Sequence, residues 1–429
     1  MGKSTRRAFL KTTSVGAAAL SWSGGINVLG ANEKVVVGLI GCGGRGPGVA
    51  REMGGAAFVC DPDTDRLASA AKKFNVDSSN AVTDMRRIFD NKSVDAVIIA
   101  TPDHWHAPAA LLALEAGKHV YVEKPCSHNF RESQLLVEAA RRYKRVVQHG
   151  TQSRSKGTVA DAIQMLREGI IGDVLMAKAW NIQRRKNIGH EKPSDPPPGV
   201  DYDAWVGPAE FVAFQKNRFH YTWHWWYNFG TGDMGNDGTH EIDYARWGLG
   251  VETFPTKIAG LGTKLFFDDD QEFPDTQTVV FDYPGDGKVG SRRQLIFEMR
   301  IWSTNAPYDC DNGAEFYGTK GRMFLTKRGN VEIFDEKNQK VEAKAKNPPQ
   351  LLGHQEDFID AIKTGRKPNA DMEIAHHSVA LVHLGNIACR LGRLLNFDPK
   401  TEQIAGDEEA SRLLKRTYRK EGHWAIPKG

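Results

Sequence analysis

A glycine-rich motif near the start of the chain has the residue types and spacing of a dinucleotide-binding loop. Gly41, Gly43 and Gly46 form a G-x-G-x-x-G sequence after an apolar run, and Asp61 ends a second apolar run 20 residues beyond Gly41. In such loops the glycines let the backbone approach a pyrophosphate, and the acidic residue binds the adenosine ribose hydroxyls. An acid at position 61, with no arginine immediately after it, favours NAD over NADP as the cofactor. The simpler alternative for Asp61, as N-cap of a helix from Thr64 onward, is compatible with ribose binding.

A second group of polar residues lies in the glycine-rich segment 230–243. If this segment is helical, one face of the helix carries Asp233, Asn236, His240 and Asp243, because residues at i, i+3 and i+7 lie on the same side. Glycines recur every three residues there, and each lowers helix propensity by about 1 kcal/mol. So much glycine in a helix indicates close approach of a neighbouring backbone or a ligand. We therefore expect Asp233 and Asn236 to contact a substrate.

Just before this segment, aromatic residues alternate with more polar ones over positions 219–229. A period of two predicts an extended segment with one aromatic face and one more polar face. Aromatic rings can stack on the apolar faces of sugars while histidine and asparagine side chains reach the hydroxyls. Trp223 and His224 are therefore candidate sugar contacts, with packing in a core as the alternative. The histidine pairs at 104–106 and 376–377 lack a third ligand at zinc-type spacing, so no metal site is predicted.

These residues lie on or beside elements that alternate between strand and helix in the first third of the chain. Buried strands are predicted at 35–40, 56–60, 94–100, 119–122 and 146–148, and a helix at 108–116. The alternation predicts a doubly wound parallel α/β sheet, a dinucleotide-binding domain over residues 32–150. Ligands of such sheets bind at the carboxyl ends of the strands. Thr101-Pro102-Asp103 and Glu123-Lys124-Pro125 follow two of these strands, so we expect both segments to face the cofactor.

The following region, residues 151–365, contains many strand-like runs separated by short turns. The turns at 285–288 and 327–330 have the glycine, aspartate and lysine residues typical of hairpins. We expect an α+β domain, with an antiparallel sheet and helices on one face, that binds substrate and contributes to oligomer contacts. Residues 366–393 predict a long helix, so 366–429 is assigned to a C-terminal helix and tail.

Residues 1–31 have the pattern of a secretory leader, with a basic start, a short apolar stretch and small residues near its end. Arg6 and Arg7, followed by Phe9-Leu10-Lys11, resemble a twin-arginine signal. This resemblance predicts export to the periplasm, whereas a basic N-terminal helix is the alternative. The apolar stretch is far shorter than the ~20 residues that a membrane span requires.

The overall charge argues against a surface built for polyanions, though not against a small local patch. The chain has 57 Lys and Arg against 53 Asp and Glu, and the excess of four belongs to the leader, which has no acidic residue. With the leader removed, the net charge is zero, so no nucleic-acid partner is expected. Apolar residues at 40% and charged residues at 26% are typical of an ordinary globular protein. Five cysteines in so long a chain do not form a disulfide framework.

Three motifs together resemble the Gfo/Idh/MocA oxidoreductase family, which includes glucose–fructose oxidoreductase and inositol dehydrogenases. They are Ala100-Thr101-Pro102-Asp103-His104-Trp105-His106, Ala116-Gly117-Lys118-His119-Val120 and Glu123-Lys124-Pro125. The resemblance covers nearly all of the chain after the leader. It implies a Rossmann domain followed by a domain with an open, mainly antiparallel sheet. It also implies assigned roles: Lys124 and His240 as catalytic residues, and Thr101, His106 and Glu123 as cofactor contacts.

Asn236 departs from the family pattern, because many members carry an aspartate four residues before the catalytic histidine. An amide can orient a substrate hydroxyl but cannot accept its proton. The acid–base work is then expected from Lys124 and His240, with Asp233 in support.

The sequence therefore predicts an exported, NAD-dependent oxidoreductase that moves a hydride between nicotinamide and a carbinol carbon of a sugar, polyol or glycoside. Outside the cytoplasm a released cofactor would be lost, so tight binding of the cofactor is expected. A redox-neutral, NAD-dependent glycosidase or lyase is the alternative, and a non-catalytic sugar-binding protein is a further one. The expected partners are a small sugar or glycoside and further copies of the chain, as a dimer or tetramer, with no membrane segment after removal of the leader.

Overall fold

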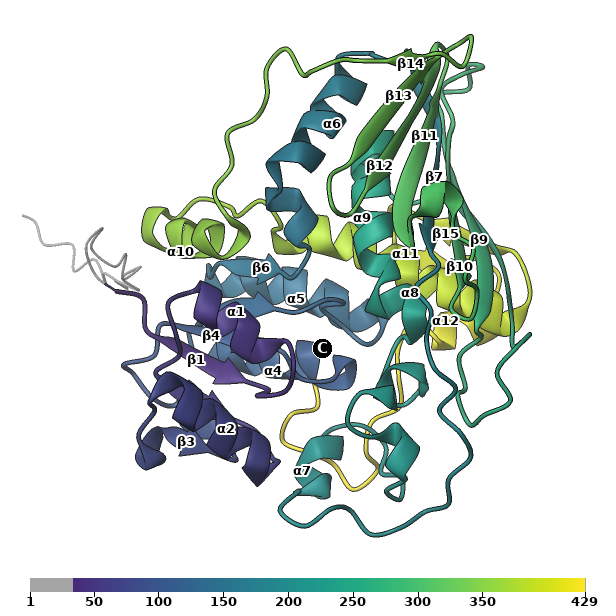
Figure 1. The fold of residues 1–429 in the computed structure, drawn as a ribbon. Coiled ribbons are helices and arrows are strands. Elements are labelled where there is room, and N and C mark those ends of the chain that lie inside the picture. The colour runs from purple at the N-terminus through teal and green to yellow at the C-terminus, as the bar shows by residue number, and fades with distance from the viewer. Residues whose placement is uncertain (1–33, 429) are drawn as a thin grey trace, which may run out of the picture.

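The computed structural model describes residues 34–428 and contains two sheets, one near each end of the molecule in Figure 1. The leader predicted over residues 1–31 lies outside the described residues. The six-stranded sheet has the order β3-β2-β1-β4-β5-β6, and each of its strand pairs is parallel. This is the strand order of a dinucleotide-binding Rossmann fold, so the predicted doubly wound sheet is confirmed.

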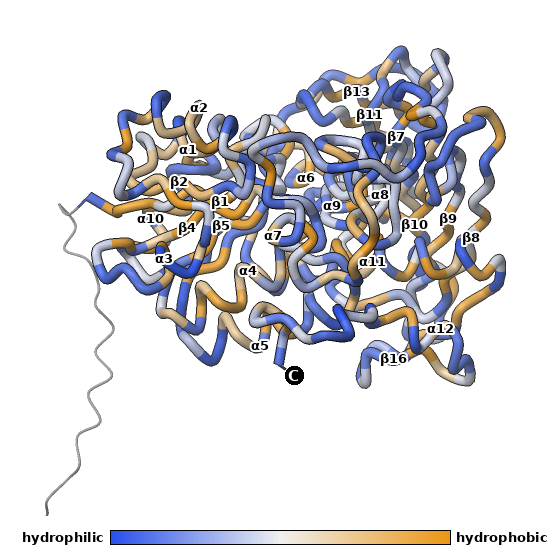
Figure 2. The backbone as a smooth tube through the Cα atoms, turned by 90° about the horizontal axis from the view of Figure 1, so that it is seen from below, coloured by the Kyte–Doolittle hydropathy of each residue, from blue (hydrophilic) through white to orange (hydrophobic). Residues whose placement is uncertain are grey.

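The elements of this half alternate along the chain. The strands are β1 (Val37–Ile40), β2 (Phe58–Cys60), β3 (Ala81–Val82), β4 (Ala96–Ile99), β5 (His119–Val122) and β6 (Val147–His149). The helices are α1 (Gly46–Glu52), α2 (Thr64–Phe74), α3 (Arg86–Phe89), α4 (Asp103–Glu115) and α5 (Phe130–Tyr143), with a 3₁₀ turn η1 (Ser78–Asn80). Strands β1, β2 and β4 are buried along their whole length, and Figure 2 shows them in the colours of hydrophobic residues.

Helix α4 begins five residues before the sequence prediction of 108–116 placed it. Pro108 lies inside this helix, although it has no N–H to donate to the carbonyl of His104 four residues earlier. The Arg416 side chain donates to that carbonyl instead, with a 2.8 Å distance from Nη2 to the His104 oxygen. A distant arginine therefore offsets the hydrogen bond that the proline removes.

The second sheet has ten strands in the order β14-β13-β12-β11-β7-β10-β9-β8-β15-β16. They are β7 (Val174–Asn181), β8 (Lys257–Thr263), β9 (Thr276–Tyr283), β10 (Arg293–Arg300), β11 (Asn312–Gly318), β12 (Gly321–Thr326), β13 (Val331–Asp335), β14 (Lys340–Val341), β15 (Leu395–Asp398) and β16 (Gln403–Ile404). The pairing is antiparallel except between β7 and β10, as expected of a mainly antiparallel sheet. The turns predicted at 285–288 and 327–330 connect β9 to β10 and β12 to β13.

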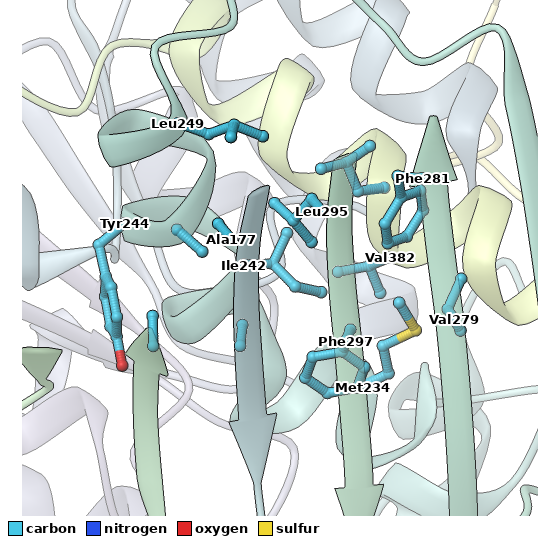
Figure 3. Close-up of a cluster of buried hydrophobic side chains, with 14 of the residues drawn as sticks. Ala177, Met234, Ile242, Tyr244, Leu249, Val279, Phe281, Leu295, Phe297 and Val382 are labelled. Atoms are coloured by element: carbon cyan, nitrogen blue, oxygen red, sulfur yellow. The ribbon is translucent and has the colours of Figure 1, made fainter. Parts of the chain in front are cut away.

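Helices pack on one face of this sheet and form the main core with it. The remaining helices are α6 (Gly157–Arg167), α7 (Tyr202–Val206), α8 (Gly232–Asn236), α9 (Gly238–Leu249), α10 (His354–Thr364), α11 (Met372–Leu391) and α12 (Glu408–Arg412). The 3₁₀ turns are η2 (Gln152–Ser155), η3 (Lys216–Arg218), η4 (Thr222–Trp225) and η5 (Pro307–Asp309). Figure 3 shows Met234 of α8 and Ile242 of α9 against Phe297 and other side chains of the sheet. This packing fixes where α8 and α9 stand relative to the sheet.

The prediction of an extended segment over 219–229 is wrong. The chain there forms η4 and loop, and three of its aromatic residues pack into a buried cluster with residues of α7: Trp223, Trp226 and Phe229. Polar side chains bend the backbone, because the His224 ring bonds to the Tyr221 carbonyl and the Asn228 amide donates to the Glu210 carbonyl. These side-chain bonds to the backbone compete with a strand.

Two helix predictions also need correction at their boundaries. The helix predicted over 366–393 begins at Met372, because the Asp371 side chain caps it by accepting from the N–H of Ile374 at 3.0 Å. The segment 230–243 is two helices that meet at Asp237, so the single helical face expected there does not exist as one unit.

Candidate active site

A large cavity lies at the carboxyl ends of the parallel strands, bounded on the other side by α8, α9 and the 219–229 segment. Its volume is about 990 Å³, near the upper end of the ~300–1,000 Å³ common for small-molecule sites. The sequence-predicted residues that line it are Gly41, Gly43, Asp61, Thr101, His106, Glu123, Lys124, Trp223, His224, Asn236 and His240. Gly46 and Asp233 do not line it. The cavity thus brings the candidate cofactor residues and most candidate substrate residues together.

The glycine loop passes close to the neighbouring backbone. Gly41 has a φ of +91°, and a Cβ on it would lie 2.5 Å from the Ala100 oxygen. A Cβ on Gly46 would lie 2.2 Å from the oxygen of Gly41, so only glycine lets α1 start this close to the end of β1. Gly46 therefore allows the close packing of the glycine loop against the start of α1, and it does not face the cavity.

The Asp61 carboxylate anchors the same loop. Its Oδ2 accepts from the N–H of Cys42 at 2.7 Å, and its Oδ1 accepts from the N–H of Asp63 at 2.9 Å. Burial raises the pKa of Asp61, and these two N–H groups oppose the rise. The N-cap of α2 is Asp63, whose side chain accepts from the N–H groups of Asp65 and Arg66. The alternative of Asp61 as N-cap is therefore wrong, while ribose binding by its carboxylate stays a prediction.

Glu123 connects the end of β5 to the glycine loop. Its Oε1 accepts from Arg45 Nε at 2.8 Å in an ion pair whose carboxylate is nearly buried. Burial opposes ionisation of Glu123, yet the charge of Arg45 and then that of Lys124 hold its pKa below the usual range. Glu123 is therefore a carboxylate whose position is fixed by the loop.

His106 holds two strand ends together. Its Nδ1 lies 2.6 Å from the Pro125 carbonyl and its Nε2 lies 2.8 Å from the Thr101 carbonyl. Burial lowers the pKa of His106, and a neutral ring can donate to one of these carbonyls at a time. Its single N–H bonds to one carbonyl while the other ring nitrogen faces the second, so His106 lies between the loops after β4 and β5.

The Lys124 ammonium group is held by one residue of α8. Its Nζ donates to the Asn236 side-chain Oδ1 at 3.0 Å and also to the backbone oxygen of Asn236. The Asn236 amide in turn donates to Asp233 Oδ1 at 3.3 Å and to the Tyr221 hydroxyl at 3.4 Å. Asn236 thus orients Lys124 from across the cavity, so the residue that departs from the family pattern holds the lysine with neutral oxygens.

His240 lies on the same side of the cavity, one helical turn beyond Asn236. The ring is 4% exposed, and its Nδ1 is buried without a hydrogen-bond partner. Burial, and then the charges of Lys327 and Lys124, lower the pKa of His240 well below its usual range. The imidazole is therefore neutral near pH 7.

Asp233 lies behind Asn236 and away from the cavity. Its carboxylate is fully buried and forms a two-point ion pair with Arg185, at 2.7 Å and 2.8 Å. Arg185 also pairs with Asp237, which is 3.2 Å from Lys327 Nζ. The direct substrate contact predicted for Asp233 thus has no support from this geometry, because the Arg185 charge holds the carboxylate in the wall. Asp243, expected on the same face, pairs with Arg154 elsewhere.

Trp223 and His224 form a stacked pair in the cavity wall. Their ring centroids are 3.6 Å apart with planes 19° apart, and both residues are nearly buried. Burial lowers the pKa of His224 to about 3, so its ring is neutral. Beside them, the half-exposed Tyr221 also lines the cavity. This wall has the flat and hydrogen-bonding groups that a sugar ring contacts.

Sequence reasoning did not place Lys327 in the cavity wall. Lys327 comes from the β12–β13 turn, where the sequence indicated only a hairpin, and its charge acts on His240. Asp103, which was expected to face the cofactor because it follows a strand, does line the cavity. Burial raises the pKa of Asp103 to about 7, while Thr231 Oγ1 donates to its Oδ2 at 2.5 Å. The place of Asp103 after β4 was the signal, whereas nothing local in the sequence places Lys327.

The residues present fit a dinucleotide. Thr101 lines the cavity, and its Oγ1 is buried without a partner in the protein, so it can bond to a ligand. The loop at Gly41, the Asp61 carboxylate and the Glu123 end of β5 surround the same space. By contrast, His, Cys, Asp and Glu residues form no group of three suited to a metal ion within residues 34–428. Over that same range we find no helix with the length and apolar character needed to cross a membrane.

Comparison with protein families matches two successive parts of the chain. Residues 35–151 match the model "Oxidoreductase family, NAD-binding Rossmann fold", GFO_IDH_MocA, and residues 178–426 match "Oxidoreductase family, C-terminal alpha/beta domain", GFO_IDH_MocA_C2. Together these matches cover the parallel sheet, nearly all of the second sheet and most residues that line the cavity.

Among curated proteins, the chain is 29% identical over 192 residues to levoglucosan dehydrogenase of Pseudarthrobacter phenanthrenivorans, covering 45% of this chain and 42% of that protein. It is 26% identical over 277 residues to scyllo-inositol 2-dehydrogenase (NAD(+)) of Bacillus subtilis, covering 63% and 66%. It is 32% identical over 208 residues to glycosyl hydrolase family 109 protein 2 of a Shewanella species, covering 41% and 45%. The matched segments thus span less than two thirds of each relative.

Among solved structures, levoglucosan dehydrogenase in complex with NADH superposes with a TM-score of 0.63 at 20% identity, covering 85% of this chain and 99% of that one. At this identity the likeness shows a shared fold.

Proposed function

The chain belongs to the Gfo/Idh/MocA family of NAD-dependent oxidoreductases, and we propose that its substrate is a sugar, a polyol or a glycoside. The observation that carries this proposal is the meeting of three features in one cavity. Lys124 is fixed by Asn236, a neutral His240 stands beside it, and the Trp223–His224 pair offers a surface for a sugar ring.

In the proposed reaction a carbinol group loses a proton from oxygen and a hydride from carbon. Bound NAD supplies the hydride acceptor. Lys124 donates a hydrogen bond to the substrate oxygen and stabilises the negative charge that develops there. We assign acceptance of the hydroxyl proton to His240, because its ring lines the cavity and its Nδ1 has no hydrogen-bond partner in the protein. Reduction of a carbonyl substrate uses the same two residues in the reverse direction.

Asn236 sets the charge at this site. Where many family members have an aspartate, its amide holds Lys124 without neutralising the ammonium charge. The Lys124 ammonium, whose charge also acts on Glu123 and Asp237, then has no carboxylate bonded to it from position 236, while proton acceptance depends on His240. Asp233 and Arg185 support Asn236 from behind and act as positioning residues.

We further propose that the protein is exported by the twin-arginine route and keeps its NAD through repeated turnovers. The basis is the leader sequence, with Arg6-Arg7 followed by Phe9-Leu10-Lys11. An exported enzyme has no pool of free dinucleotide, so each turnover must return the cofactor to its starting state. Replacing Arg6 and Arg7 with lysines should leave folded, cofactor-loaded protein in the cytoplasm, as measured by cell fractionation. Normal export of this variant would contradict the assignment of a twin-arginine signal.

A second candidate function is cleavage of glycosides without net oxidation. The observation that favours it is the match to a glycosyl hydrolase family 109 protein. Transient oxidation next to the glycosidic carbon makes a C–H bond acidic, elimination breaks the linkage, and the hydride returns to the product. The same pair, Lys124 and His240, would serve the proton transfers.

Product analysis separates the two candidates. Purified protein is incubated without added NAD with free sugars, polyols and nitrophenyl glycosides, and the products are measured by chromatography and absorbance. Oxidised sugar paired with a reduced second sugar supports the oxidoreductase, whereas released nitrophenol without net oxidation supports glycoside cleavage. Absence of both kinds of product across the panel would contradict the proposed substrate class.

A further inference from the structure

The C-terminal tail returns to the parallel-sheet half of the molecule and ends beside the cavity. Figure 1 shows this yellow segment leaving the region of α12, passing α7 and ending near α4. Its last described residues include His423 and Trp424, which line the cavity together with Met85 and Arg86 after β3. The tail therefore contributes a wall to a cavity whose floor is built far earlier in the sequence.

Buried contacts hold the tail in place. Arg416 Nε lies 2.9 Å from Glu132 Oε1 on α5, and the Tyr418 hydroxyl donates to the same carboxylate oxygen at 2.9 Å. Arg416 also donates to the His104 carbonyl that Pro108 leaves without its helical donor. A cation inside the protein needs such partners, so this part of the tail is fixed on α4 and α5.

Further along, the tail is attached to the α7 region. Arg419 donates from its backbone N–H to the Pro208 oxygen at 3.0 Å, and its side chain pairs with Asp203 at 2.7 Å. Residues before α7 reach the β2–α2 loop, where the Thr64 N–H donates to the Gly199 oxygen at 3.0 Å and the Asp201 N–H donates to the Pro62 oxygen at 3.0 Å. The tail and residues 199–206 thus enclose the end of the cavity that contains Asp61.

At the Asp61 end of the cavity, the side chains that line it have planar groups and are partly exposed. Trp424 is 40% exposed although it lines the cavity, and the Arg86 guanidinium lies 4.6 Å from its ring centroid. Asp84 holds Arg86 in a two-point pair, with distances from 2.6 to 3.0 Å. The Trp105 ring lies 5.7 Å from that of Trp424. Tryptophan rings and guanidinium planes are the surfaces on which purine bases stack.

We propose that Trp424 and Arg86 form the adenine-binding subsite of the NAD site, and that the anchored tail keeps the cofactor from leaving. The proposal rests on the NAD dependence of the enzyme and deepens the proposed cofactor retention. An acidic residue after β2 binds the adenosine ribose in Rossmann folds, so Asp61 marks this end of the cavity as the adenosine end. Dissociation of NAD then requires the tail or residues 199–206 to move.

The test compares fragments of the cofactor, so that it does not depend on hydride transfer. Trp424→Ala is compared with the wild type, with Trp424→Phe, and with Trp302→Ala. Trp302 is a matched control because it is a half-buried tryptophan in the turn after β10 that stacks on Phe266 and does not line the cavity. Calorimetry measures binding of ADP-ribose, which has the adenosine half, and of nicotinamide mononucleotide, which has the other half.

Trp424→Ala is expected to weaken ADP-ribose binding at least ~10-fold, the scale of loss of one aromatic–base stack, and to leave nicotinamide mononucleotide binding unchanged. Trp424→Phe should keep most of the affinity, and Trp302→Ala all of it. Arg419→Met, which frees the tail from Asp203, should speed the loss of bound NAD during gel filtration.

Equal ADP-ribose affinity in the wild type and Trp424→Ala would overturn the subsite, as would an equal loss for both fragments. Unchanged retention of NAD in Arg419→Met would overturn the retaining role of the tail. If the wild type binds the fragments and NAD but oxidises no sugar, the proposed substrate class fails while the adenine subsite stands. If the variant Trp424→Ala does not fold, Arg86→Met beside it should give the same loss for ADP-ribose alone, and an unchanged affinity there would equally overturn the subsite.

Discussion

Replacing Lys124 with methionine removes the group that we assign to the substrate oxygen while keeping most of the side chain's length. The Lys124 Nζ makes two hydrogen bonds to Asn236, at the backbone oxygen and at Oδ1. A positioned acid–base or charge-stabilising group contributes ~10²–10⁴-fold to turnover, or about 3–5 kcal/mol of transition-state free energy. We expect turnover to fall by that amount. Loss of a donor to the Asn236 oxygens should also lower the free energy of unfolding by about 1–2 kcal/mol.

The assay is a single-turnover measurement of NADH absorbance in cofactor-loaded protein after sugar is added, together with calorimetric NAD binding. Lys156→Met is the matched control, because Lys156 also lines the cavity but its Nζ donates to backbone oxygens of Lys327 and Arg328. That variant should lose less than ~10-fold in turnover, since it touches no group of the proposed proton transfer. Near-normal turnover in Lys124→Met would refute the assignment. A loss explained fully by weaker NAD binding would make Lys124 a cofactor contact instead.

Three further outcomes are expected. His240→Ala should lower turnover at least ~10²-fold. In the double variant with Lys124→Met, the losses of activation free energy should be less than additive, because both residues serve one proton transfer. Strictly additive losses in steady-state kinetics would contradict this shared role. Asp61→Ala should weaken NAD by about 1–3 kcal/mol in calorimetry, whereas an unchanged affinity would remove Asp61 from the ribose site. Burial lowers the pKa of His383 to about 3 from 6.5, so the unfolded chain takes up its proton first and stability is lost as pH falls below 6.5. His383→Gln should reduce the slope of unfolding free energy against pH by up to about 1.4 kcal/mol per pH unit between pH 6.5 and about 3. The same slope in wild type and variant, measured by denaturant titrations, would contradict a lowered pKa for His383.

The parallel sheet was predictable because its strands are buried on both faces and therefore read as continuous apolar runs. The run before Gly41 and the run before Thr101 are of this kind. Strand β3 was missed, since it is two residues long, Ala81 and Val82, and gives no pattern. The prediction began helix α4 at Pro108, since proline is usually found in the first turn of a helix. In the structure Pro108 lies inside the helix, and the distant Arg416 bonds to the carbonyl that it leaves without a donor.

The candidate site was predictable where its residues follow strands, and less so where it depends on pairing between distant elements. Glu123 and Lys124 follow β5, so the fold class alone brings them to the cavity. Asp233 looks like a substrate contact from spacing, but Arg185, far away in the sequence, holds it in the wall. Lys327 reaches the cavity only through the pairing of β12 with β13.

The aromatic segment and the tail show the limits of local pattern. Alternation over 219–229 indicated an extended segment, yet the chain there has hydrogen bonds from His224 and Asn228 to the backbone and packs against α7. The tail has mixed composition and no periodicity, so nothing in the sequence indicated that Trp424 returns to the cavity.

The most direct test of the proposed activity is transfer of deuterium from a substrate carbon to the bound cofactor. Purified protein, without added NAD, is mixed with sugars and polyols deuterated at their carbinol carbons, and the cofactor released by denaturation is analysed by mass spectrometry. We predict that NAD(H) comes with the protein and that one deuterium appears in its nicotinamide ring, in the wild type and far less in Lys124→Met. Protein that carries no NAD(H), or a cofactor that stays unlabelled with every sugar and polyol of the panel, would contradict the account.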